Sequence, residues 1–206
     1  MDTRLRVGRA VCKREEEGAL ELMQILQQAH PHAPPALATD AKGGYAEAMI
    51  QTWGKVPPYS GQGRPAKHKQ PGADWKYLQV QKIRSGSRLL EVRTRVVWGD
   101  PEEVEALLGR HTAYIERTQL TSRQMNARLV RKTLSFSKQL RCLRAACAWE
   151  DALYNWTRPN RSLRESGEGA QERCDDRTPA MAAGLTQHRW SVQQLLMTVV
   201  PPVAIN

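Results

Sequence analysis

The sequence predicts an α/β fold with a basic helical C-terminal part, and three observations lead to it. Residues 3–12 and 35–40 look like short strands, and each is followed by a segment of helical periodicity, at 15–29 and at 43–54. Two strands joined through a helix normally pair in parallel. Helical patterns then dominate residues 101–156. We therefore expect a small sheet with at least one parallel strand pair, followed by helices.

The first two elements are predicted from their periodicity. Residues 3–12, TRLRVGRAVC, alternate loosely between basic and apolar side chains, as an edge or second strand with one solvated face does. Residues 15–29 begin with three glutamates, which the helix dipole favours, and carry Leu20, Met23 and Leu26 on one stripe. These patterns predict a strand and then an amphipathic helix.

The second strand ends in an acid, Asp40, and the helix after it is bounded by glycines. The carboxyl end of a strand is where α/β sheets place ligands and catalytic groups. The alternative is that Asp40 only caps the helix or turn that follows, which is the commoner role of an isolated Asp. The residues by themselves leave both interpretations open.

The middle of the chain predicts an insertion. Residues 54–75 are rich in Pro, Gly and Lys and have no periodicity, so we expect a loop. Residues 76–98 contain two alternating segments joined at 85–87, Ser-Gly-Ser, which indicates a β-hairpin. The basic residues of this hairpin either face DNA or form the solvated face of a two-stranded ribbon.

The second half of the chain is expected to be helical. Residues 101–109 have Pro at the first helical position and acids in the first turn. Residues 121–124, Thr-Ser-Arg-Gln, match a capping box and predict a new helix that carries Met125, Leu129 and Leu134 inward. We expect a polar linker and a short helical tail over 157–206.

The charge of the chain suggests a polyanionic partner. The 206 residues include 31 Lys and Arg against 21 Asp and Glu, a formal net charge of +10. From Arg117 to Trp149 every charged residue is basic, and Glu116 is the acid directly before this run. Nucleic acid is the obvious partner, although an excess of positive charge also serves solubility alone.

Other bulk features favour a reduced, cytoplasmic protein. The four cysteines form no CxxC pair and no dense disulfide framework. The first residues are charged and lack the apolar core of a signal peptide. The apolar run LLMTVV is too short to cross a bilayer, so no membrane partner is expected.

Residues 114–138, YIERTQLTSRQMNARLVRKTLSFSK, resemble the block around the last catalytic glutamate of DDE-type insertion-sequence transposases. The resemblance is to the small bacterial family of the first-described insertion sequence. TRLRVGRAV with the acidic helix after it resembles the third strand and first helix of that family, and LATDAKGGYAEAM resembles its second catalytic Asp and the helix that follows. LYNWTRPNRSLR and RTPAMAAGLT resemble its C-terminal segment. Together these stretches cover nearly the whole chain.

The resemblance implies an RNase H-like fold, the integrase/transposase catalytic core, over residues 1–156 with a loop and hairpin insertion at about 54–98. In that fold three carboxylates bind two divalent ions that activate a water or a 3′ hydroxyl for attack at phosphate. By position Asp40 is the second catalytic carboxylate and Glu116 the third. Both would bind Mg²⁺, or Mn²⁺ in its place.

The same resemblance implies double-stranded DNA as partner, at the ends of the element and in the target. The cations after Glu116 would neutralise phosphates along the DNA path without reading sequence. They are Arg117, Arg123, Arg128, Arg131, Lys132 and Lys138. A homo-oligomer, or a separately encoded N-terminal transposase segment, is a further expected partner, and the location expected is the bacterial cytoplasm in association with the nucleoid.

The chain also departs from the family pattern. The first catalytic Asp of the family lies upstream of the segment that TRLRVGRAV resembles, and Asp2 is a poor substitute, so we expect an N-terminally truncated member. Asp40 and Glu116 are separated by 75 residues, more than in the shortest family members. Asn160 stands in an RPN motif where some relatives have His.

Three functions remain open from the sequence. The first is DNA transposition, in which a DDE transposase cleaves and transfers strands with a bound metal ion. The second is a non-enzymatic DNA-binding remnant that regulates transposition. The third is a basic scaffold unrelated to transposases.

Overall fold

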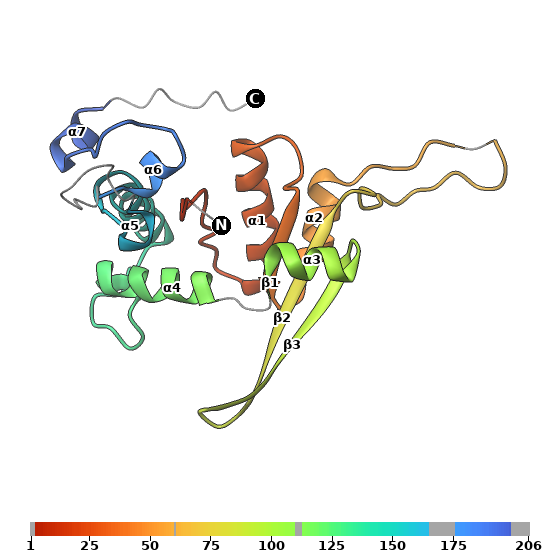
Figure 1. Ribbon diagram of the computed structural model, residues 1–206, viewed down its shortest axis with the longest axis horizontal. Helices are drawn as coiled ribbons and strands as arrows, with labels where there is room; N and C mark the ends of the chain where they lie inside the picture. Colours follow the sequence, from red (N-terminus) through yellow and green to blue (C-terminus); the bar gives the residue numbers. More distant parts are fainter. Residues whose placement is uncertain (1–2, 60, 110–112, 165–175, 199–206) are drawn as a thin grey trace, which may run out of the picture. The chain divides into compact units, whose positions relative to one another are not determined.

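The computed structural model describes residues 3–59, 61–109, 113–164 and 176–198 and shows a mixed α/β protein (Figure 1). The chain forms two compact units. One unit comprises residues 10–121, and the other comprises residues 1–9 together with 122–206. No helix among the described residues is long and apolar enough to cross a membrane.

The first unit is built on a three-stranded sheet in the order β1-β2-β3. β1 (Ala36–Asp40) is parallel to β2 (Lys76–Ser85), and β2 is antiparallel to β3 (Arg88–Trp98). The predicted hairpin is therefore confirmed, with its turn at Gly86 and Ser87. The predicted strand ending at Asp40 is confirmed as well, and the long connection to its parallel neighbour contains the predicted loop.

The prediction of a strand at residues 3–12 is wrong. These residues form no strand, and β2, not this segment, is the parallel partner of β1. The alternation of basic and apolar residues arises from another cause. Arg6 and Arg9 bind carboxylates of a helix in the second unit, so the segment is extended without belonging to a sheet.

One face of the sheet is covered by α1 (Glu15–Ala29) and α2 (Tyr45–Trp53), both of which were predicted. Met23 of α1 is fully buried and packs with Ala19 and Ala48, and Leu37 of β1 packs against this cluster. Because side chains alternate along a strand, Leu37 and its register partner Tyr77 point to this face.

The other face of the sheet packs against α3 (Pro101–Leu108), also as predicted (Figure 1). Val104 of this helix is fully buried with Leu78 and Val80 of β2. Asp100 is the N-cap of this helix, because its side chain accepts a hydrogen bond from the backbone N–H of Glu103 at 3.0 Å. Gly99 has φ +94°, and a Cβ there would lie 2.8 Å from Val104 Cγ2, so only glycine fits.

The capping-box prediction is wrong, because residues 121–124 lie inside α4 (Ala113–Met125). The residues before Thr121 are themselves compatible with a helix, so the helix already begins at Ala113 and does not start at Thr121. After α4 comes the single turn η1 (Ala127–Leu129), whose N-cap is Asn126. Leu134, expected inside, is 98% exposed.

The second unit is mostly helical. α5 (Leu140–Ala152) continues into the wider turn η2 (Leu153–Thr157), and the short η3 (Arg161–Leu163) follows. Further along are α6 (Pro179–Ala182) and α7 (Val192–Met197), which is the short helical tail expected from the sequence. A capping box between Ser191 and Gln194 starts α7.

Candidate functional site

Asp40 is the last residue of β1 and its side chain is exposed. Its Oδ1 accepts a hydrogen bond from the backbone N–H of Lys42 at 3.4 Å. This is a local contact in the turn after β1, as expected if Asp40 only caps that turn. Burial and, after it, the negative charge of Asp40 raise the pKa of Tyr45 at the start of α2. The carboxylate therefore stands at the carboxyl end of the strand and close to the next helix.

Glu116 lies in the first turn of α4 and forms an ion pair with Lys82 of β2. Its side chain is 51% exposed, so the pair is solvated. An acid is favoured in the first turn of a helix, and the ion pair with Lys82 adds to this preference. Sequence analysis did not identify Lys82 as a partner, because the two residues come from separate elements.

Lys82 places Glu116 on the same face of the sheet as Asp40. Asp40 is the register partner of Val80, so their side chains point to one face. Lys82 is two residues beyond Val80 and points to that face too, with its Cα about 7 Å further along the strand. Asp40 and the lysine that binds Glu116 therefore point to one face of the sheet, and all three residues belong to the same compact unit.

The donor chemistry of this pair suits one divalent cation. Carboxylate oxygens are the ligands that Mg²⁺ and Mn²⁺ prefer. In the described part of the chain, however, no group of three or more His, Cys, Asp or Glu side chains is placed to hold a metal ion. The ammonium group of Lys82 also binds an oxygen of Glu116, so it competes with a cation for that ligand.

The six cations predicted to bind DNA are all exposed. Two lie on α4, one lies in η1, and the other three lie between η1 and α5, in the order Arg117, Arg123, Arg128, Arg131, Lys132 and Lys138. Arg117 belongs to the unit of residues 10–121, and the other five belong to the second unit. Their exposure leaves the guanidinium and ammonium groups accessible to phosphate.

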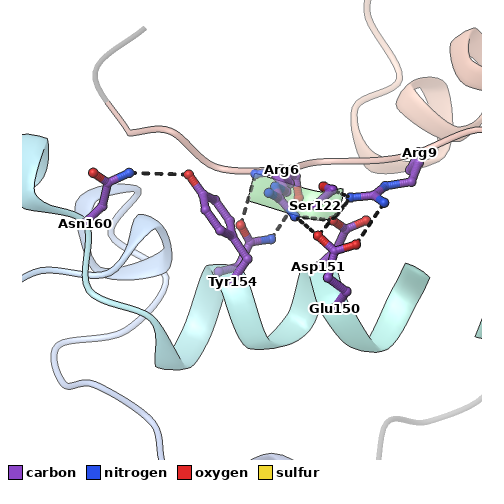
Figure 2. Close-up of polar contacts among 8 residues, drawn as sticks. Arg6, Arg9, Ser122, Glu150, Asp151, Tyr154 and Asn160 are labelled. Carbon is purple, nitrogen blue, oxygen red and sulfur yellow. Dashed lines mark hydrogen bonds and ion pairs between the residues drawn. The ribbon is translucent and has the colours of Figure 1, made fainter. Parts of the chain in front are cut away.

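The second unit contains a buried charge network that sequence analysis missed (Figure 2). Residues 3–9, the N-terminal arm, lie along α5 and bring two arginines to two acids at its end. Arg9 binds Glu150 at 2.9 Å and Asp151 at 2.7 Å, and Arg6 binds both acids too. Glu150 is almost fully buried, so these pairs operate away from solvent.

The backbone of the N-terminal arm also forms hydrogen bonds with the second unit's helical segment. The side chain of Asn155 accepts a hydrogen bond from Arg6 N at 3.0 Å and donates one to Arg6 O at 2.8 Å. The Arg6 guanidinium also lies 3.7 Å from the centre of the Tyr154 ring, a cation–π contact (Figure 2). Asn155 thus satisfies the backbone groups that a neighbouring strand would have satisfied.

Glu150 stays ionised despite its burial. Burial raises the pKa of Glu150, but hydrogen bonds from Ser122, Arg9 and Arg6 outweigh it and hold the pKa below its ordinary value. Ser122 also accepts a hydrogen bond from Arg9 at 2.9 Å, so it joins the two charges (Figure 2). The ion pairs of this network tie the N-terminal arm to α5.

Comparison with models of protein families, with curated proteins and with solved structures finds no match for this chain. The function is therefore inferred from the chain itself: the two carboxylates on one sheet face, the exposed cations and the sequence motifs around them.

Proposed function

We propose that this chain is part of a DDE-type insertion-sequence transposase with an RNase H-like fold, and that Asp40 and Glu116 are two of its metal-binding carboxylates. The observation that carries this proposal is the Lys82–Glu116 ion pair, because it brings Glu116 to the sheet face of Asp40. The position of Asp40 at the end of a parallel strand supports it. The α/β architecture is compatible with such a fold.

The chemistry proposed is phosphoryl transfer on DNA. A bound Mg²⁺ or Mn²⁺ ion supplies activation of the attacking oxygen and charge stabilisation at phosphate. Asp40 and Glu116 would hold this ion, and the ion pair with Lys82 positions Glu116 in its absence. The exposed cations from Arg117 to Lys138 hold the DNA backbone, and their contacts with phosphate position the duplex without selecting a sequence. Element ends, target DNA and further copies of the chain are the proposed partners.

One observation favours the alternative of a non-enzymatic DNA-binding regulator. In the structure Glu116 already has a cationic partner, Lys82, which competes with a metal ion for its carboxylate. A protein that keeps the cations but does not bind metal would occupy the same DNA without cutting it. The two functions therefore share DNA binding and differ in metal binding.

Metal binding by the chain tests the proposal directly. We expect Asp40→Asn and Glu116→Gln each to weaken Mn²⁺ binding by about tenfold or more, since each removes a ligand. Electron paramagnetic resonance of free Mn²⁺ measures this affinity. Glu103→Gln is the matched control, because Glu103 is 58% exposed and is also paired with a β2 lysine, Lys76. Equal affinities in all four proteins would rule out the proposed ligand pair.

Strand cleavage and transfer on a labelled element-end duplex then separates the two functions. The assay is run on the chain alone and after addition of a polypeptide that carries the first catalytic Asp of the family. We expect products with the unmodified chain under at least one of these two conditions, and none when Asp40→Asn or Glu116→Gln replaces it. Duplex binding with no cleavage under any condition would favour the regulator.

A further inference from the structure

Residues 126–138, here named the apolar-basic turn, hold large apolar side chains in solvent. Leu134 is 98% exposed and Phe136 is 60% exposed, and Val130 nearby is exposed as well. Phe136 is also the one phenylalanine of the sequence. Single exposed apolar residues are ordinary, whereas three within seven residues concentrate exposed apolar surface in one short segment, a feature associated with interaction sites.

Hydrogen bonds within the turn maintain this arrangement. Arg128 donates to the Ser137 hydroxyl at 2.9 Å and so ties the two ends together. Thr133 Oγ1 accepts a hydrogen bond from the backbone N–H of Ser135 at 3.0 Å, and these two residues flank Leu134. Lys132 has φ +57°, a left-handed conformation that is uncommon for a residue with a side chain. The turn is therefore a loop held by its own hydrogen bonds, with its apolar side chains exposed to solvent.

The charges around the patch indicate what binds it. Exposed cations stand before, between and after the apolar residues: Arg128, Arg131, Lys132 and Lys138. No acid occurs from Arg117 to Trp149, so nothing in this part of the sequence neutralises them. The same turn of a second copy carries the same positive charge, so two of these turns would repel each other. The partner that fits is a polyanion with apolar surfaces inside, and duplex DNA has this chemistry.

We propose that the apolar-basic turn is a DNA wedge, in which Leu134 and Phe136 enter a groove and insert between base pairs while the surrounding cations bind the flanking phosphates. This proposal rests on the DNA partner of the proposed function and adds the mode of contact. Insertion of Leu or Phe costs base stacking, and the phosphate contacts and the added protein surface offset that cost. Such a wedge bends DNA and needs no particular base sequence.

The wedge and the cations affect binding in different ways, which provides the test. The affinity of each protein for a mixed-sequence duplex is measured over a salt series. We expect Leu134→Ala/Phe136→Ala to bind about tenfold more weakly at every salt concentration, with an unchanged slope of log affinity against log salt. Arg131→Ala/Lys132→Ala should instead reduce the slope by about two.

The matched control is Leu196→Ala/Met197→Ala on α7, which removes two residues that are 68% and 75% exposed in the same unit. We expect this variant to bind duplex DNA as the unmodified chain does. Thermal unfolding by circular dichroism checks that all variants are folded, as expected when only exposed side chains are shortened.

A duplex with 2-aminopurine in place of successive adenines reports insertion, because its fluorescence rises when the base is unstacked. We expect a rise with the unmodified chain and none with Leu134→Ala/Phe136→Ala. The proposal is overturned if that variant binds like the unmodified chain, if it changes self-association in sedimentation instead, or if the unmodified chain does not bind duplex. Asp40→Asn should retain the rise, so a failure of catalysis does not affect this result.

Discussion

At the scale of single residues, Glu150 is a buried side chain held by several charged and polar partners. It is buried and accepts hydrogen bonds from Ser122, Arg9 and Arg6. A buried ion pair adds little net stability compared with a well-packed apolar pair, but removal of one partner leaves the other charge buried without compensation. The N-terminal arm is thus held by interactions that are costly to break, and Glu150 is the buried acid among them.

We predict that Glu150→Gln lowers the free energy of unfolding by about 3–5 kcal/mol at neutral pH. The pKa of Glu150 is lower in the folded than in the unfolded protein, so its contribution is present above the ordinary pKa of 4.5. That contribution is lost as the pH falls through the folded pKa. The difference between the two proteins should therefore narrow below about pH 4.5.

Urea unfolding at several pH values measures this, with fluorescence of Trp156 and Trp190 as a signal, since their rings lie 4.8 Å apart in the same unit. Asp176→Asn is the control, because Asp176 pairs with Arg164 at 2.7 Å but in solvent. Such a surface pair contributes about 0–1 kcal/mol. A difference between Glu150→Gln and the unmodified chain that stays constant down to pH 3 would contradict the role given to the carboxylate.

At the scale of elements, the sequence predicts those whose signals are local. α1 has an acidic first turn and an apolar stripe, α3 has Pro at its first position, and the hairpin has a glycine between two alternating segments. Each of these patterns determines its own backbone conformation. For the same reason Asp40 could be placed at a strand end, because the apolar run and the glycines lie on either side of it.

The elements that were predicted wrongly from the sequence depend on contacts with residues far away in the sequence. Residues 3–12 alternate like a strand, but their arginines bind acids about 140 residues away in the sequence. The capping pattern at 121–124 is overridden because α4 already runs through it, and Ser122 serves the arginine network instead. In the candidate site, Lys82 was missed because its pairing with Glu116 joins a strand to a helix. Periodicity carries no information on such pairings.

We predict that Val104→Ala weakens the packing of α3 on the sheet by roughly 2 kcal/mol, since it removes a fully buried side chain that packs with Leu78 and Val80. Val92→Ala on β3 is the control, because Val92 is exposed. Hydrogen exchange of the β2 and β3 amides measures the change. Faster exchange in Val104→Ala alone is expected, and equal exchange in both variants would mean that α3 does not stabilise the hairpin.

At the scale of the whole molecule, two surfaces that belong to different units carry exposed positive charge and are candidates for contact with DNA. One is the hairpin, with Arg88, Arg93 and Arg95 exposed on β3, and the other is the apolar-basic turn. The hairpin cations include one that already has a carboxylate partner, since Arg93 binds Glu91 at 2.8 Å. Net charge alone therefore does not tell which surface binds phosphate.

The last prediction separates the two surfaces with variants that remove the same charge. Arg128→Ala/Arg131→Ala/Lys132→Ala and Arg88→Ala/Arg93→Ala/Arg95→Ala each remove three positive charges from the +10 of the chain. Each phosphate contact contributes about 0.9 to the slope of log affinity against log salt. We expect the first variant to lower the slope by about 2.7 and the second to leave it nearly unchanged, as measured by fluorescence anisotropy of a labelled duplex. Equal losses would show that DNA responds only to total charge, and a larger loss for the second variant would move the DNA path to the hairpin.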